Sequence, residues 1–182
     1  MGRKVNVIGV GMVKFQKPGA SDGYEVMASG AIKEAMKDAG VDFKEFEQAY
    51  AGYVFGDSTC GQRAVYAVGQ TGIPVINVNN NCSTGSSALY LARQAIEGGL
   101  AECVLAVGFE QMEKGALAAK WSDRTNPLDK HVDVMNAQQG VNEAPFAAQS
   151  SSSPWARSPP PRPSPRPLRI SSTRRWIVSR RS

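Results

Sequence analysis

The chain has 182 residues, of which 42% are hydrophobic, so it is long enough for one domain with its own core. Its net charge of +5 is unevenly placed. All 16 acidic residues but only 13 of the 21 basic ones precede Ser150, so basic character belongs to residues 150–182 alone. Charge therefore does not mark the whole chain as a nucleic-acid-binding protein. No apolar run approaches the ~18 residues of a membrane span, and three cysteines without metal-ligand spacing fit a reducing compartment.

Residues 1–149 alternate apolar runs with amphipathic stretches. The pattern predicts strands at 4–10, 48–55, 74–78 and 102–109. It predicts a helix capped by Asp22 with Glu25 and ended by Gly40, a short helix capped by Asp42 with Glu45, and helices at about 62–69 and 82–97. This βαβαβαβ order predicts an α/β fold, with a mostly parallel sheet, helices on both faces and ligand chemistry at the carboxyl ends of the strands. Residues 115–149 have a weak period and are interpreted as the start of a loop excursion over that edge.

Cys82 is the strongest candidate for a catalytic residue. It follows the predicted strand at 74–78 through three asparagines and precedes Ser83-Thr84-Gly85, where a helix of small residues begins. The free N–H groups and the positive dipole of a helix N-terminus favour a thiolate there, and a backbone N–H could stabilise an oxyanion beside it. The pattern therefore indicates acyl transfer through Cys82, with a buried structural cysteine as the alternative.

The other candidate residues are expected to have structural roles. Cys103 lies in an apolar strand and should belong to the core, and Cys60 should be a packed thiol in a glycine-rich loop at the same sheet edge as Cys82. His131, the single histidine, falls in the predicted excursion and is expected to be structural or exposed to solvent.

Residues 150–182 differ in composition from the rest. They contain eight Arg, ten Ser and seven Pro, and neither Asp nor Glu. So few large apolar side chains cannot offset the entropy of folding, which predicts a disordered tail. One hypothesis is aberrant translation beyond Gln149. The competing hypothesis is a binding element, in which Pro159–Pro163 would bind an SH3-like groove and the arginines a nucleic acid or an anionic membrane.

Several segments of residues 4–149 resemble the thiolases, and among them the sterol carrier protein X type. The matching segments are Val7–Met12, Gly52–Arg63, Asn77–Gly85, Ala101–Ala106, Ser122–Arg124 and Asp129–Val132. The resemblance implies an acyltransferase that resolves a 3-oxoacyl-CoA with coenzyme A into two acyl-CoA molecules, or runs the condensation in reverse, with Cys82 as the acylated residue. It further implies coenzyme A thioesters as substrates, no bound cofactor or metal, a homodimer through this half and a peroxisomal location. The final Ser179-Arg180-Arg181-Ser182 is not a Ser-Lys-Leu peroxisomal address, so a cytoplasmic location is the alternative.

The resemblance covers only the N-terminal half of the family. The family's Gly-His-Pro segment, its His-Asp-Cys-Phe segment and its second cysteine-bearing glycine loop are absent from this sequence. We therefore expect Cys82 to be acylated without turnover. We also expect a sheet deprived of its last strand to expose an unpaired edge, so that the chain aggregates or pairs with another protomer. A fragment of a decarboxylating condensing enzyme, which shares the fold and the cysteine nucleophile, is the enzymatic alternative.

Overall fold

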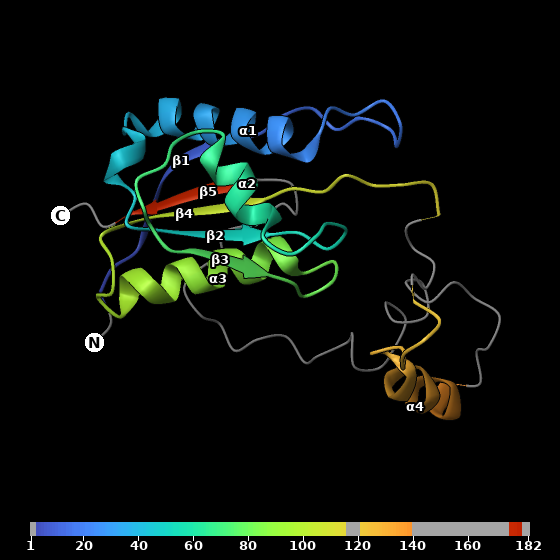
Figure 1. Ribbon diagram of the computed structural model, residues 1–182. Coiled ribbons are helices and arrows are strands. Elements are labelled where there is room, and N and C mark those ends of the chain that lie inside the picture. Colours follow the sequence, from blue (N-terminus) through green and yellow to red (C-terminus); the bar gives the residue numbers. More distant parts are fainter. Residues whose placement is uncertain (1–2, 116–120, 140–174, 180–182) are drawn as a thin grey trace. The chain divides into compact units, whose positions relative to one another are not determined.

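A computed structural model describes residues 3–115 and 121–139, and the backbone of residues 175–179. Its central sheet has five strands in the order β1-β5-β4-β2-β3 (Figure 1). The strands are β1 (Asn6–Gly11), β2 (Gln48–Gly52), β3 (Val75–Val78), β4 (Cys103–Gly108) and β5 (Arg175–Ser179). β2 pairs in parallel with β3 and β4, whereas β5 is antiparallel to both of its neighbours, β1 and β4. The four strands joined by helices are thus parallel, and the predicted α/β fold is confirmed.

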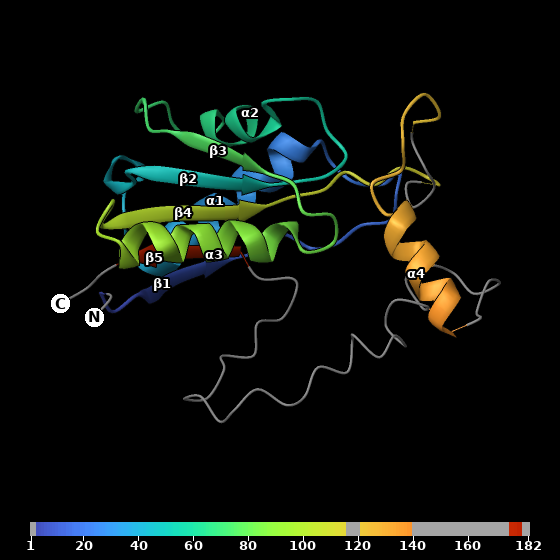
Figure 2. The ribbon, with the colours of Figure 1, turned by 90° about the horizontal axis from the view of Figure 1, so that it is seen from below.

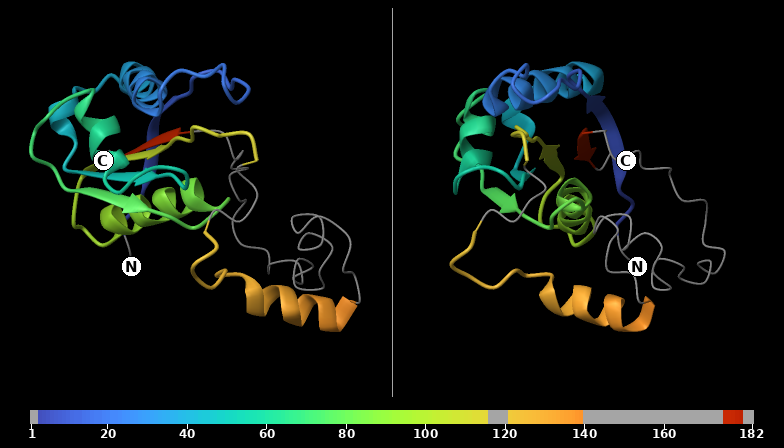
Figure 3. Two further views of the ribbon diagram at one scale, coloured as in Figure 1. Left: turned by 45° about the vertical axis from the view of Figure 1, so that its right-hand side comes forward. Right: turned by 90° about the vertical axis from the view of Figure 1, so that its right-hand side faces the viewer.

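Helices cover both faces of the sheet. α1 (Tyr24–Ala39) and α2 (Cys60–Tyr66) lie on one face and α3 (Thr84–Glu97) on the other, as the end-on view in Figure 3 shows. β4 is buried on both faces, with Leu105 and Val107 in the cluster under α1 and α2, and Val104 and Ala106 in the cluster under α3. Cys103 is buried in the first cluster, so its expected place in the core is confirmed.

The helix ends follow the sequence signals unevenly. Asp42 and Glu45 form the predicted capping box around a short 3₁₀ helix (Phe43–Glu45), and Gly40 ends α1 in the left-handed conformation at φ 67°. The prediction that Asp22 caps α1 is wrong. The N-cap is Gly23, without a side-chain hydrogen bond, and the Tyr24 N–H donates instead to Gln111 Oε1 at 3.1 Å. A residue 87 positions along the chain thus replaces the local cap.

β5 corrects two expectations about the C-terminal segment. Residues 175–179 are not disordered, because they form a strand in the interior of the sheet, between β1 and β4 (Figure 1). The position expected to be vacant is therefore filled by the chain itself. The physical reason is that β1 and β4 offer main-chain hydrogen-bonding partners on both sides of this short apolar run. Residues 150–174 and 180–182, including Pro159–Pro163, lie outside the described residues.

The chain divides into two compact units, Met1–Lys114 with Ile170–Ser182, and Gly115–Arg169. In the second unit the described residues form helix α4 (Asp129–Gln139) in the segment expected to be a loop excursion, seen best in Figure 2. His131 lies on α4 and is exposed, as expected. Among the described helices, none combines the length and apolar character needed to cross a membrane.

Candidate active site

The Cys82 thiol lies in the loop between β3 and α3, two residues before α3 begins at Thr84. It is exposed, whereas Cys60 and Cys103 are buried. The thiol donates a weak hydrogen bond to Asn81 Oδ1 at 3.9 Å. No charged residue and no histidine occurs between Arg63 and Arg93, so the loop and α3 residues next to Cys82 in the sequence contribute only peptide and side-chain dipoles. This geometry leaves a nucleophile open to solvent at the start of a 14-residue helix.

Thr84 holds this loop to the helix. Its side chain is buried, and its hydroxyl accepts from the Asn80 N–H at 2.9 Å and donates to the Asn81 carbonyl at 2.5 Å. The Asn80 amide adds a hydrogen bond to Ser87 Oγ at 2.8 Å. One threonine thus fixes the backbone on the N-terminal side of Cys82. Sequence reasoning did not single it out, although its place in the first turn after a run of asparagines is a usable signal.

Gly52 lets α3 approach the end of β2. A Cβ atom at Gly52 would lie 2.9 Å from Thr84 Cγ2 and 3.0 Å from the Thr84 carbonyl oxygen. Gly52 pairs with Gly108 of β4 and with Val78 of β3, so it stands in the middle of the carboxyl edge of the parallel strands. Because Gly52 has no side chain, the first turn of α3, and with it Cys82, can pack directly against this edge.

The backbone before each cysteine of this edge is unusual. Thr59 has φ 68° and Asn81 has φ 48°, and they are the non-glycine residues with positive φ in the described part of the chain. Cys60 and Cys82 follow directly. Asn tolerates the left-handed region, whereas for a β-branched Thr it costs roughly 1–2 kcal/mol. Such strain gathers where a side chain must be aimed in a fixed direction.

Cys60 and Cys82 follow the ends of β2 and β3, as predicted, but on different faces of the sheet. Cys60 begins α2 and belongs to the core under α1 and α2, so it is a helix residue rather than part of a tight loop. Cys82 precedes α3 on the opposite face (Figure 3). The two thiols do not form one constellation. His131 belongs to the second unit.

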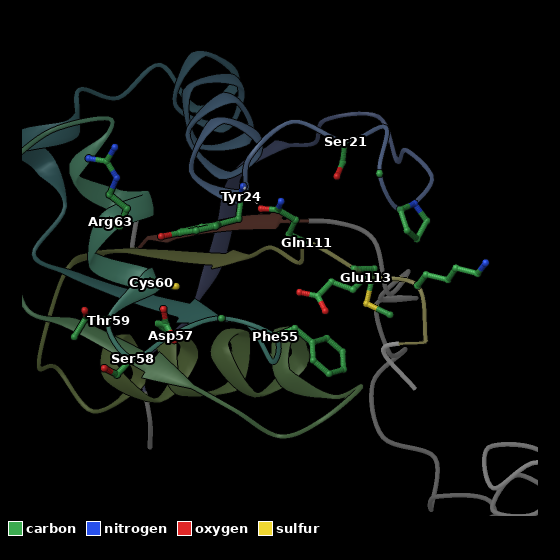
Figure 4. A pocket seen from close by; sticks show the side chains of 15 residues that line it. Ser21, Tyr24, Phe55, Asp57, Ser58, Thr59, Cys60, Arg63, Gln111 and Glu113 are labelled. Atoms are coloured by element: carbon green, nitrogen blue, oxygen red, sulfur yellow. Dashed lines mark hydrogen bonds between the residues drawn. The ribbon is translucent and has the colours of Figure 1, made fainter. Parts of the chain in front are cut away.

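A cavity of about 760 Å³ opens beside Cys60, on the α1–α2 side (Figure 4). It is lined by Pro18, Gly19, Ser21, Tyr24, Phe55, Gly56, Asp57, Ser58, Thr59, Cys60, Arg63, Gln111, Met112, Glu113 and Lys114. Phe109 stacks on the rings of Tyr24 and Tyr53, at 5.3 and 5.1 Å between centroids. The Glu110 carboxylate accepts from the N–H groups of Val54 and Phe55 at 3.0 and 3.1 Å and fixes the neighbouring loop. Sequence analysis missed this cavity, because its lining comes from three separate segments.

Tyr24 and Cys60 interact in this cavity, and the interaction should be visible at alkaline pH. A hydrogen bond to Cys60, with burial as a smaller cause, raises the pKa of Tyr24 from 10.0 to about 12. A raised folded-state pKa contributes stability below the unfolded value and loses it as pH rises from about 10 to about 12. We expect the urea midpoint of the native chain to fall more steeply across this range than that of Tyr24→Phe. Cys60→Ala should flatten the dependence in the same way, and equal slopes in all three proteins would contradict this account.

Comparison with known proteins identifies the family. The model of the thiolase N-terminal domain matches residues 5–149. The chain belongs to the thiolase family. It is 59% identical over 149 residues to sterol carrier protein 2 of Oryctolagus cuniculus, covering 80% of this chain but 27% of that protein. It is 34% identical over 110 residues to the benzoylsuccinyl-CoA thiolase subunit BbsB of Thauera aromatica, covering 59% of this chain and 28% of that one. This thiolase-family chain therefore spans little more than a quarter of the length of these curated relatives.

The fold is also found outside the thiolases. The crystal structure of 3-oxoacyl-[acyl-carrier-protein] synthase III from Aquifex aeolicus matches with a TM-score of 0.52 at 19% identity, covering 59% of this chain and 45% of that one. At this identity the likeness concerns the fold alone.

Proposed function

We propose that this thiolase-family chain accepts an acyl group from a coenzyme A thioester on Cys82. The observation that carries the proposal is the exposed Cys82 thiol at the start of α3, on the carboxyl edge of the parallel strands. Cysteine is intrinsically nucleophilic. The acyl group of a coenzyme A thioester is already activated, so it can pass to a cysteine directly. The names of the relatives, a sterol carrier protein and a coenzyme A thiolase subunit, support a lipid-derived acyl-CoA as the substrate class.

The proposed step is a thioester exchange. The Cys82 thiol gives its proton to water, and its sulfur attacks the thioester carbonyl carbon, whose oxygen then carries the negative charge of the tetrahedral intermediate. N–H groups of the first turn of α3 are oriented to stabilise such an oxyanion. The carbon–sulfur bond to coenzyme A then breaks, coenzyme A leaves as a thiolate that takes a proton from water, and the acyl group stays on Cys82.

Turnover requires a second step that these residues do not supply. A further thiol must attack the acyl-Cys82 carbonyl, and a base must take the proton of that thiol. The sequence contains one histidine, His131, on a helix of the other unit. We therefore propose that the chain performs acylation and leaves deacylation to groups outside these 182 residues.

A two-stage mass measurement tests this function. The purified chain is incubated with acetyl-CoA, freed of excess reagent and then exposed to coenzyme A. We expect intact mass to rise by about one acetyl group per chain, as a one-thiol acyl-enzyme requires. We expect the group to remain during the coenzyme A chase. If the chain never gains the acetyl group, the proposed acylation is wrong. If the acetyl group is lost rapidly during the coenzyme A chase, the proposal that these residues supply no base for deacylation is wrong.

We also propose that two copies of this chain pair with each other. A peroxisomal location is a separate part of the proposal. β3 stands at one edge of the sheet, and its outer side is a ready site for another strand. Size-exclusion chromatography with light scattering should give twice the chain mass, and a compact monomer would contradict the pairing.

A further inference from the structure

We propose that the gap between β1 and β4 is a strand-binding site, which residues 175–179 occupy as a tethered ligand and which a separate peptide of the same sequence can enter. The recognition chemistry is main-chain hydrogen bonding to two flanking strands, as in β-strand addition. The site differs from the Cys82 edge and does not depend on the acyl-transfer function.

The β4 wall is held without the help of β5. β4 pairs in parallel with β2 from Val104 to Gly108, and its buried side chains pack into both core clusters. The Glu47 carboxylate accepts from the N–H groups of Glu102 and Cys103 at 2.8 and 3.3 Å and fixes the start of the strand. Removal of β5 would therefore leave a formed strand with one open edge.

The β1 wall is held by α1. Cβ atoms at Gly9 and Gly11 would lie 2.4 Å from the Ala35 carbonyl oxygen and 2.2 Å from that of Ala31, so β1 rests directly on the helix backbone. The Val10 N–H donates to Asp38 Oδ2 of α1 at 2.8 Å. α1 thus attaches β1 to the rest of the domain through contacts that do not involve β5.

The two walls are also tied together at one end of the gap. Arg3, which precedes β1, forms an ion pair with Glu102, which precedes β4, at 2.5 Å. The Arg3 N–H donates to the Glu97 carbonyl at the end of α3 at 3.3 Å. In register, Ser179 of β5 stands opposite both Asn6 and Cys103, close to these ties. Residues outside β5 therefore join the two walls at this end of the gap.

The occupant is suited to recognition through its backbone. Ile177 is aligned with Gly9 on one side and with Leu105 on the other. Residues 175–179 contain no proline, although residues 150–174 contain seven, and Trp176, Ile177 and Val178 are all types that favour strands. Proline at 177 would remove a ladder donor and fit badly between two strands. Ser172→Pro, just before the strand, is the matched control.

The first experiment uses the native full chain and hydrogen–deuterium exchange. If β5 occupies the gap, amides of residues 175–179 should exchange at least about 100-fold more slowly than in a synthetic peptide of residues 170–182. Exchange at the rate of the free peptide would overturn the proposal.

The second experiment adds the labelled peptide of residues 170–182 to the full-length variants and follows fluorescence anisotropy. Ile177→Pro should bind the peptide at least about tenfold more tightly than the native chain or Ser172→Pro, whose tethered strands compete at high effective concentration. A peptide carrying Ile177→Pro should not bind. If Ile177→Pro is unfolded alone, the peptide should restore its circular dichroism. Equal binding by all three chains, or neither binding nor refolding of Ile177→Pro, would overturn the proposal.

Discussion

Cys82→Ala is expected to abolish acetylation of the chain by acetyl-CoA, with a loss of at least about 100-fold in the labelling rate, because no other exposed thiol is present among the described residues. The other two cysteines are buried, and Cys60, which lines the cavity on the α1–α2 side, is only 5% exposed. Removal of an exposed side chain should change the free energy of unfolding by less than about 0.5 kcal/mol. The measurement is intact mass as a function of time, with peptide mapping to locate the acetyl group.

Two matched variants make this test specific. Cys103→Ala removes a buried thiol from β4 and should be acetylated like the native chain, although it will be less stable. Cys82→Ser keeps a hydroxyl of similar shape and should also lose the label, because a serine hydroxyl is a weak nucleophile without an adjacent base. Acetylation that persists in Cys82→Ala and disappears in Cys103→Ala would reassign the acceptor.

Thr84→Val is expected to lower the free energy of unfolding by about 1 kcal/mol, because it leaves the partly buried Asn80 N–H without its acceptor. The valine keeps the shape of the side chain, so the loss is that of the two hydrogen bonds to the Asn80 N–H and the Asn81 carbonyl. Since these bonds fix the loop that carries Cys82, the acetylation rate should fall about tenfold, equivalent to about 1.4 kcal/mol of lost positioning. Urea unfolding and the time course of acetylation measure the two effects.

Thr84→Ser is the control for this prediction. It keeps the hydroxyl and loses the methyl group that faces Gly52, which should cost about 1 kcal/mol of stability. Its acetylation rate should stay within about twofold of the native rate, since the loop hydrogen bonds persist. If valine and serine slowed acetylation equally, packing against Gly52 and not the hydroxyl would position Cys82.

Sequence reasoning reached the parts of this fold that depend on neighbours along the chain. The order of strands and helices follows from hydrophobic periodicity, and the Asp42–Glu45 capping box and the Gly40 stop are made by residues within a few positions. The same holds for Cys82, since a strand, a polar loop and a run of small residues place it at a helix start whatever surrounds it. Local hydrogen bonding and periodicity are enough to determine these features.

Other features depend on contacts that no short segment contains. Gln111 replaces Asp22 at the start of α1, and the faces of the sheet separate Cys60 from Cys82 although both follow strand ends. Above all, the three apolar residues of 175–179 are too short a run to predict a strand beside the Ser-, Pro- and Arg-rich stretch before them. They become a strand because β1 and β4 offer main-chain partners on both sides. The free energy of such pairing is a property of the assembled sheet, so only the tertiary structure could assign it.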